Sequence, residues 1–306
     1  MPANQLPKLW GIIVTYHRPV ELGAMLRAVA LQTRPPDHVV VVDNGSDDSA
    51  RDVAQAAGAT YIDAQENLGP AGGVALAMGH ILSVAGDNDW VLSLDDDDPP
   101  LADDLIEGVW HYGLDRIEVD PLTAGVGMHG ADYNHKLGTF RRYEDQELTG
   151  DLVVSVVAGG SLPMYRISTL RKVGVFEPAL FFGFEEGEFG LRIKDAGLRL
   201  YVQGKLARRA RQLWGQWGKS SSQVRTAPGK AAWRRYYSVR NSTLLAHRYA
   251  SRWAPLYTGL GGAAKGTIAL LQQRRPLREV ILPLRGAMEG LLRRSGRTIN
   301  PARSYK

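Results

Sequence analysis

The chain has 306 residues, of which 44% are hydrophobic and none is cysteine. This length and apolar content are sufficient for one large domain or for two smaller ones, each with its own core. The lack of cysteine excludes disulfides, thiolate metal sites and a cysteine nucleophile, and it is compatible with a reducing cytoplasm. Any bound metal must therefore have oxygen or imidazole ligands.

The net charge of +5 conceals an uneven distribution along the chain. Residues 205–306 contain 22 Lys and Arg but only two acids, a net charge of +20, whereas residues 1–204 carry −15. A basic segment of this size suits a polyanion, such as nucleic acid, an anionic membrane surface or a pyrophosphate-containing substrate. No window approaches about 18 uninterrupted apolar residues, so we expect neither export nor a transmembrane span.

The N-terminal part alternates between predicted strands and predicted helices. Short apolar runs predict strands at residues 9–15, 39–42, 60–62 and 90–94, and apolar residues at helical spacing predict helices at 21–31, 49–57 and 71–84. This alternation predicts an α/β fold with a mostly parallel sheet covered by helices on both faces. Because such sheets bind ligands at the carboxyl ends of their strands, we expect the functional residues there.

Four consecutive acids, Asp95–Asp98, follow the fourth predicted strand. Adjacent carboxylates repel one another, so a folded protein keeps them where a cation or solvent offsets the repulsion. One interpretation is a divalent-cation site at the sheet edge. The other is a solvated acidic turn closed by Pro99 and Pro100, and this stretch alone favours neither.

Two further segments also follow a strand or begin a helix. Asp43 and Asn44 follow the second strand, where they suit hydrogen bonds to a base or ribose, although a structural Asx turn is the commoner role. Residues 67–73 are rich in glycine at a helix start, where the backbone can approach an anionic ligand. This loop is neither a Walker loop nor G-x-G-x-x-G, and by itself it is compatible with a plain helix-start turn.

The order of these segments resembles the successive motifs of the family 2 inverting glycosyltransferases, which have the GT-A fold. The motifs are Ile12–Pro19, Val41–Ser46, Asn67–Gly73, Asp95–Asp97, Gly159–Pro163 and Phe184–Glu188. The resemblance extends over residues 9–245. It implies a Rossmann-like GT-A domain over residues 1–205 and a basic helical region over residues 206–306. Within the family, the chain looks most like bacterial galactofuranosyl- and rhamnosyltransferases that build cell-wall polysaccharides on lipid carriers.

The resemblance implies binding of a nucleoside-diphosphate sugar. The matching positions are Thr15, Tyr16, Arg18 and Asp43 in the nucleoside pocket and Asn67, Gly72 and Gly73 in the loop that closes over the donor. Asp95 and Asp97 match the ends of the Asp-x-Asp motif, with Asp96 between them in the donor site. In the family the first acid faces the ribose or sugar and the last binds Mg²⁺ or Mn²⁺, which offsets charge on the departing diphosphate.

The acidic motif at residues 185–188 implies a general base. Its second acid is Glu186, and we expect Glu185 and Glu188 to belong to the same catalytic group. The base removes the acceptor proton as the hydroxyl attacks the anomeric carbon opposite the leaving phosphate, which inverts the configuration. Glu186 stands where relatives often have Asp. Without the upstream motifs, an acid-rich first helical turn that favours the helix dipole would be the ordinary explanation.

One departure from the family concerns the metal. Relatives usually supply a metal-binding histidine after the base helix, but the equivalent residues 213–221 contain none. We expect Asp97, diphosphate and water to hold the metal, with Gln216 nearby and Lys219 sharing the leaving-group charge. The seven histidines of the chain are scattered, and we expect each to be a surface or structural residue.

The basic segment also resembles part of the family. Residues 233–241 match the aromatic and basic helix that follows the catalytic domain, and residues 256–271 and 277–292 are apolar at helical spacing with arginines in or beside them. Basic amphipathic helices suit an anionic membrane surface, although an ordinary helical subdomain fits as well. We expect a cytoplasmic protein, peripheral on the inner face of the cell membrane, and we also consider a homodimer.

The expected reaction moves a sugar, galactofuranose or rhamnose, from a UDP- or dTDP-sugar to a hydroxyl of a polyprenyl-pyrophosphate-linked glycan. A soluble metabolite is the alternative acceptor. A nucleic-acid-binding protein, with arginines and aromatics interleaved in the basic segment, is the main competitor of another class. Two further alternatives are a nucleotidyltransferase and a catalytically inactive sugar-nucleotide binder. The ordered motif set argues for sugar transfer, so we do not expect nucleic acid as a binding partner.

Overall fold

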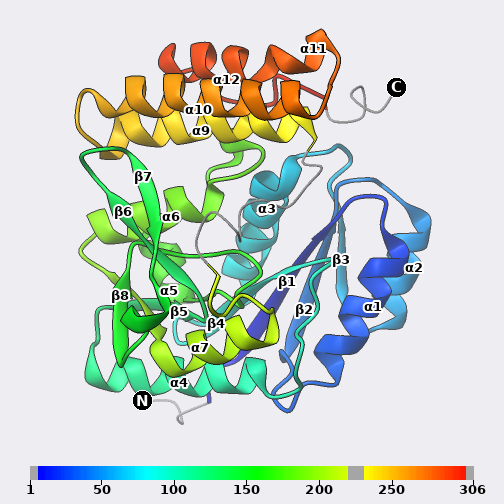
Figure 1. Cartoon of the computed structure of the whole chain (residues 1–306). Coiled ribbons are helices and arrows are strands. Elements are labelled where there is room, and N and C mark those ends of the chain that lie inside the picture. The colour runs from blue at the N-terminus through cyan, green and yellow to red at the C-terminus, as the bar shows by residue number, and fades with distance from the viewer. Residues whose placement is uncertain (1–5, 220–230, 301–306) are drawn as a thin grey trace.

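A computed structural model describes residues 6–219 and 231–300, and it is built around one eight-stranded sheet (Figure 1). In spatial order the strands are β3 (Thr60–Asp63), β2 (His38–Asp43), β1 (Leu9–Thr15), β4 (Trp90–Asp95), β10 (Met164–Arg166), β5 (Thr123–Gly127), β11 (Arg199–Gln203) and β8 (Asp151–Val154). Strands β1 to β4 are parallel, and β11 is parallel to β5, whereas β10 and β8 run antiparallel to their neighbours. The predicted α/β class with a mostly parallel sheet is confirmed.

Among the residues that the structure describes, seven helices accompany this sheet. They are α1 (Pro19–Ala30), α2 (Asp48–Ala56), α3 (Gly69–Val84), α4 (Leu105–Val119), α5 (Ile167–Val173), α6 (Glu185–Asp195) and α7 (Gly204–Leu213). The first three agree with the predicted helices to within two residues at each end. Local chemistry sets their starts: α1 begins at a proline, and the Asp47 side chain accepts a hydrogen bond from the Ser49 backbone at the start of α2.

The core lies on both faces of the sheet because its central strands are buried on both sides. Ile12 packs with Val40 and with Met78 of α3 on one face. The next residue of β1, Ile13, packs on the other face with Met25 of α1 and with the residues of α4. Successive strand residues point to opposite faces, so a continuous apolar strand is what a sheet covered on both sides requires.

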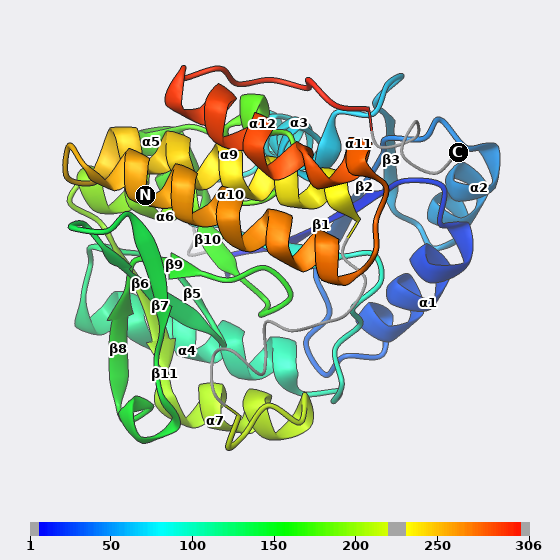
Figure 2. The ribbon, with the colours of Figure 1, turned by 45° about the horizontal axis from the view of Figure 1, so that its top comes forward.

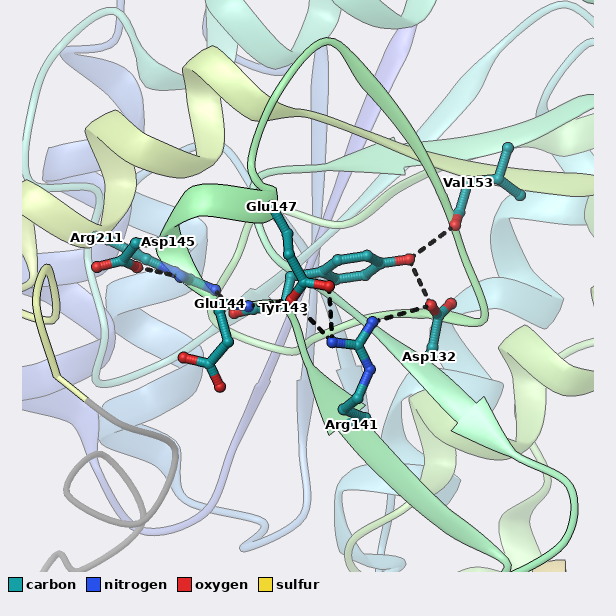
Figure 3. A network of polar contacts seen from close by, with 8 residues as sticks. All are labelled: Asp132, Arg141, Tyr143, Glu144, Asp145, Glu147, Val153 and Arg211. Carbon is teal, nitrogen blue, oxygen red and sulfur yellow. Dashed lines mark hydrogen bonds and ion pairs between the residues drawn. The ribbon is translucent and has the colours of Figure 1, made fainter.

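A second, three-stranded sheet lies beside the large one. Its order is β7 (Thr139–Arg142), β6 (Gly130–Asn134) and β9 (Val156–Val157), and the 3-10 helix η1 (Asp145–Glu147) follows β7. Figure 3 shows the polar network at this point: the Tyr143 hydroxyl donates to Asp132 and to the Val153 carbonyl, and Arg141 donates to Glu147.

The same network reaches α7, because Arg211 is buried and donates to Asp145 and to the Tyr143 carbonyl (Figure 3). A buried guanidinium needs such partners to offset its lost hydration. The hairpin β6–β7 is thereby fixed to both β8 and α7. The expected boundary between residues 205 and 206 lies inside α7, whose Ala207 and Ala210 are buried in the core of the α/β part.

The C-terminal residues form a layer of helices above α3 and α6 in Figure 1. They are α9 (Ala232–Tyr249), α10 (Ala254–Gln272), α11 (Leu277–Val280) and α12 (Leu282–Leu291). Helix α9 lies between the α/β part and the outer pair α10 and α12 (Figures 1 and 2). The basic helical region is therefore confirmed, except that the helix expected at 277–292 divides at Ile281, just before Pro283 in the first turn of α12.

Close packing within this layer depends on glycine. A β-carbon on Gly286 would lie 2.5 Å from the Tyr236 carbonyl oxygen, and one on Gly290 would lie 2.9 Å from the Arg240 carbonyl oxygen. Helices α9 and α12 therefore approach each other more closely than larger residues would allow. Among the described residues, none of the helices is both long enough and apolar enough to cross a membrane.

Candidate active site

A cleft of about 420 Å³ opens at the carboxyl edge of the large sheet. Nine of the residues singled out from the sequence line it: Thr15, Tyr16, Arg18, Asn67, Asp95, Asp96, Asp97, Glu185 and Glu186. They come from four separate segments of the chain. The fold thus brings the expected donor and base residues to a single cavity.

The register of two parallel strands positions the first of these groups. Strands β1 and β4 pair Val14 with Asp95, so the residues that follow them are neighbours at the same edge. The Thr15 hydroxyl donates to Asp96 over 2.9 Å, and Arg18 donates to both Asp96 and Asp97. The end of β1 and the acidic loop (Asp95–Asp98) are therefore held together by hydrogen bonds between residues about 80 positions apart in the sequence.

The acidic loop keeps an excess of negative charge. Asp95 is exposed to the cleft. Partial loss of solvation there, followed by repulsion from Asp97, Asp98 and Asp96, raises its pKa to about 6. Burial also raises the pKa of Asp98, which accepts a hydrogen bond from Trp214. A cation bound beside these carboxylates would offset their mutual repulsion, so its binding is favourable.

Two glycines separate the acidic loop from the base candidate. A β-carbon on Gly159 would lie 2.5 Å from Glu186 Oε1, and one on Gly160 would lie 2.8 Å from Asp98 Oδ2 and 3.5 Å from Asp95 Oδ2. Gly160 also has a positive φ of 68°, which residues with a side chain rarely adopt. The glycine pair therefore lies against both Glu186 and the acidic loop, where a larger residue would not fit.

Glu185 and Glu186 are the first two residues of α6. Burial, followed by repulsion from Glu186, raises the pKa of Glu185 well above its usual range, and Glu185 Oε2 has no hydrogen-bond partner among the described residues. Burial and the nearby Asp95 raise the pKa of Glu186 to about 7. A carboxylate with such a pKa can accept a proton near neutral pH.

Comparison with known proteins agrees with this geometry. Residues 11–160 match the profile described as Glycosyl transferase family 2. The sequence is 30% identical over 200 residues to galactofuranosyltransferase GlfT1 of Mycolicibacterium smegmatis and 32% identical over 207 residues to GlfT1 of Mycobacterium tuberculosis. The chain belongs to glycosyltransferase family 2. The alignments cover 61–62% of this chain and 66% of each relative, so they span just under two thirds of the relatives' length.

The fold of this family 2 protein also has a solved counterpart. It is similar to the mannosyltransferase PcManGT from Pyrobaculum calidifontis, whose structure contains GDP-Man and Mn²⁺, with a TM-score of 0.52. The similarity covers 99% of this chain and 84% of that one at 16% sequence identity. The expected GT-A fold is therefore confirmed, while so low an identity says nothing about the ligands of the present chain.

Four of the residues assigned through the family 2 motifs lie outside the lining of the cleft. Asp43 is fully buried and accepts hydrogen bonds from the backbones of Gly45 and Asp47, each over 2.7 Å, and from the Tyr61 hydroxyl. This is the structural Asx turn, the alternative to a nucleoside contact. Its neighbour Asn44 lines the cleft instead.

Gly72 and Gly73 lie in the first turns of α3 rather than in a free loop. A β-carbon on Gly73 would lie 2.5 Å from Val14 Cγ1, and one on Gly72 would lie 2.7 Å from the Leu68 side chain. Gly73 thus lets α3 pack directly against β1, and Gly72 leaves room for the Leu68 side chain at the start of the helix. The part of this motif that reaches the cleft is Asn67, Gly69 and Pro70.

Glu188 is the fourth of these residues. Its buried carboxylate accepts hydrogen bonds from Arg192, from Arg248 and from the Tyr249 hydroxyl. These partners join α6 to the end of α9. The arrangement is structural, so we leave Glu188 out of the catalytic group proposed below.

The cleft also contains aromatic residues that the sequence had not assigned to it. Phe176, Phe181, Phe182 and Trp233 line it, and Arg234 lies beside them. The rings of Phe182 and Trp233 are 4.8 Å apart, and the Arg234 guanidinium lies 5.1 Å from the Phe182 ring. For Trp233 and Arg234, the signal was the aromatic and basic motif at 233–241. It predicted a helix but not its contact with the loop at residues 181–184.

Asp95 and Asp97, the acids expected at the metal, both line the cleft. Within residues 6–219 and 231–300, no group of three or more His, Asp or Glu side chains is arranged to hold a metal ion. In the segment after the base helix, Trp214 contacts the acidic loop through a hydrogen bond to Asp98. The last two residues of that segment, Ser220 and Ser221, lie outside the described residues.

Proposed function

We propose that this family 2 protein is an inverting glycosyltransferase that uses a nucleoside-diphosphate sugar. The observation that carries the proposal is the single cleft that both the acidic loop and Glu186 line. Inverting transfer needs a site for the diphosphate on one side of the anomeric carbon and a base on the other. The cleft has both kinds of group in its lining, the acids of residues 95–97 and the proposed base Glu186.

The donor side of the cleft comprises Thr15, Tyr16, Arg18, Asn67 and the acidic loop. Asp95 and Asp97 would hold Mg²⁺ or Mn²⁺, and the unbalanced charge that raises the pKa of Asp95 supports that fit. When bound, the ion supplies positive charge to the diphosphate as it leaves. Asn44 supports the loop at residues 67–70, which we call the donor loop. Its side chain donates to the Gly69 carbonyl and accepts from the Leu68 backbone.

Glu186 is the proposed general base. The acceptor hydroxyl oxygen forms the new bond to the anomeric carbon, the bond from that carbon to the phosphate oxygen breaks, and the hydroxyl proton passes to Glu186. A pKa near 7 suits this role because the group is substantially deprotonated at neutral pH and still basic. The raised pKa of Glu185 keeps this neighbouring carboxyl group protonated near neutral pH, so Glu186 is the one of the two that can accept the proton.

The proposed donor is a UDP-sugar, with galactofuranose as the sugar and dTDP-rhamnose as the alternative. The two galactofuranosyltransferases to which the sequence is similar support this choice. Family membership alone leaves the sugar open, because specificity depends on a few contacts in the cleft.

The proposed acceptor is a polyprenyl-pyrophosphate-linked glycan presented at the inner face of the cell membrane. Its support is the wall of Phe182, Trp233 and Arg234 beside the base, which combines aromatic faces with a positive charge. A second support is the outer face of α10–α12, where apolar side chains are exposed at helical spacing: Trp253, Leu256, Leu260, Ile268, Leu271, Leu277, Ile281, Leu284, Met288 and Leu292. Arginines beside this face suit anionic lipid.

A thermal-shift panel tests the donor site. UDP, dTDP, GDP and ATP are each added with and without Mn²⁺ to the wild type and to Asp97→Asn. We expect UDP with Mn²⁺ at 100 times its Kd to raise the Tm of the wild type by about 5 °C and to have little effect on the variant. Equal stabilisation of both proteins would remove Asp97 from the metal site, and no stabilisation by any nucleotide would contradict the proposed function.

A further inference from the structure

The loop between the 3-10 helix η2 (Pro178–Leu180) and α6 has an unusual backbone. We call it the base loop (residues 181–184). Phe181 and Phe184 have positive φ values of 62° and 70°, and Gly183 between them has 77°. Residues with a β-carbon adopt this region unwillingly, so contacts from outside must hold the loop in place. The loop leads directly into Glu185 and Glu186, and its Phe181 and Phe182 line the cleft.

Those contacts come from two consecutive buried residues of α9. The Asn241 side-chain amide lies 3.0 Å from the Leu180 carbonyl oxygen, 3.0 Å from that of Phe182 and 2.8 Å from that of Gly183. Arg240 donates to the Leu180 carbonyl over 2.8 Å. Both side chains are fully buried, so these bonds are shielded from water.

The two residues also fix each other. Arg240 Nε donates to Asn241 Oδ1 over 2.9 Å, which leaves the amide nitrogen of Asn241 to face the three carbonyls. The Arg240 guanidinium also lies 4.7 Å from the Tyr237 ring and donates to the Gly296 carbonyl. Burying a guanidinium is unfavourable unless its N–H groups make hydrogen bonds. Here they donate to backbone carbonyls at Leu180, before the base loop, and at Gly296 in the C-terminal segment.

The opposite side of the same loop contacts the donor loop. A β-carbon on Gly69 would lie 2.1 Å from the Phe181 carbonyl oxygen, and the Ala71 backbone donates to that oxygen over 3.4 Å. The base loop is therefore held between α9 and the start of α3. A displacement on the α9 side moves Glu186 relative to a donor bound at the ends of β1 and β4.

From this arrangement we infer that Arg240 and Asn241 are positioning residues that set the place of the base Glu186 relative to the donor. The inference rests on the proposed function. Loss of their hydrogen bonds leaves the donor contacts at Thr15, Arg18 and the acidic loop intact, because those contacts belong to other elements. The loss therefore lowers kcat while the affinity for the donor stays the same.

The test compares Asn241→Asp with wild type in the full-length chain. This change keeps the shape of the side chain but turns a carboxylate oxygen toward three carbonyl oxygens. We expect kcat to fall about 100-fold, as for a base displaced by about 1 Å, while the thermal stabilisation by UDP and Mn²⁺ stays within twofold. Hydrogen exchange of the backbone at residues 178–187 is expected to quicken, a readout that does not depend on turnover.

Ser242→Ala is the matched control. Ser242 is the next residue of α9, and its hydroxyl donates to the Val239 carbonyl within the same helix over 3.0 Å. We expect wild-type kcat and wild-type exchange from it. If Asn241→Asp fails to fold, Arg240→Lys takes its place, because lysine keeps the charge but cannot bond the loop and the C-terminal segment together.

The outcomes separate the inference from the proposed function. A variant with wild-type kcat, or with unchanged exchange at residues 178–187, overturns the positioning role. Equal losses of kcat and donor stabilisation also overturn it, since they indicate general damage. If the wild type itself transfers no sugar, the proposed function fails, and the exchange experiment alone then decides whether α9 holds the loop.

Discussion

At the scale of single residues, the environment of Glu186 determines how the proposed reaction depends on pH. Burial and Asp95 raise its pKa to about 7, and a base acts only when deprotonated. We therefore expect kcat/KM to fall about tenfold per pH unit below about 7 and to level off above it. Glu186→Gln is expected to lower kcat by about 10³-fold, because general base catalysis contributes 10²- to 10⁴-fold.

Glu188→Gln is the matched control for this prediction, since it changes an acid on the same helical turn in the same way. Its carboxylate pairs with Arg192 and Arg248, so we expect a lower Tm but the same limb in the pH profile. Initial rates between pH 5 and 9 and thermal unfolding of both variants provide the measurement. A pH limb that persists in a still active Glu186→Gln would assign the base elsewhere.

Sequence reasoning at this scale succeeded where a residue follows a strand directly. Thr15 and Asp96 meet because the parallel register of β1 and β4 forces their ends together. It failed to place Asp43 and Gly73, because an Asx turn and a close helix–strand contact use the same residue types as a ligand site. The contact of Trp233 with Phe182 was beyond it, since only the packing of α9 brings the two together.

At the scale of elements, α3 depends on the smallness of one residue. A β-carbon on Gly73 would lie 2.5 Å from Val14 Cγ1, so Gly73→Ala must push α3 away from β1. We expect the free energy of unfolding to fall by about 1–3 kcal/mol, as for other overpacked sites. Chemical denaturation of the purified variant measures this loss.

Gly79→Ala is the control on the same helix. A β-carbon there would meet nothing within 4 Å, so the higher helix propensity of alanine should act alone and stabilise the protein by up to about 1 kcal/mol. Opposite signs for the two substitutions are the expected result. If both variants gained stability, the contact between α3 and β1 would be looser than the structure indicates.

The elements that the sequence predicted best are the regular ones. Strands β1 and β2 are continuous apolar runs buried on both faces, and α1 to α3 have clear apolar spacing and starts. Strand β10 has only three residues and β9 only two, so no period can be read from them. Their places depend on the neighbours with which they pair.

At the scale of the whole molecule, the outer face of α10–α12 predicts binding to anionic membranes. Leu260 on α10 has 62% of its surface exposed. We expect Leu260→Glu to weaken binding to phosphatidylglycerol vesicles about tenfold or more, because it removes an apolar contact and adds repulsion, while Tm stays the same. Vesicle co-sedimentation measures the affinity.

Val119→Glu is the control for this experiment. Val119 is 72% exposed at the end of α4, which lies on the opposite side of the molecule in Figure 1. It should bind vesicles as the wild type does. If the two variants lost affinity equally, or if the wild type bound RNA with a steep dependence on salt and ignored vesicles, the membrane proposal would be wrong.

The base loop is recognised through its backbone, and this affects how acceptor choice can change over evolution. The Asn241 side-chain amide bonds to the carbonyl oxygens of Leu180, Phe182 and Gly183. A carbonyl is the same whichever residue carries it. Substitutions at Phe182 can therefore alter the proposed acceptor wall while the contacts that position the proposed base Glu186 are kept. If the proposed roles hold, the backbone contacts of Asn241 leave the side chain at Phe182 free to vary while the position of Glu186 is preserved.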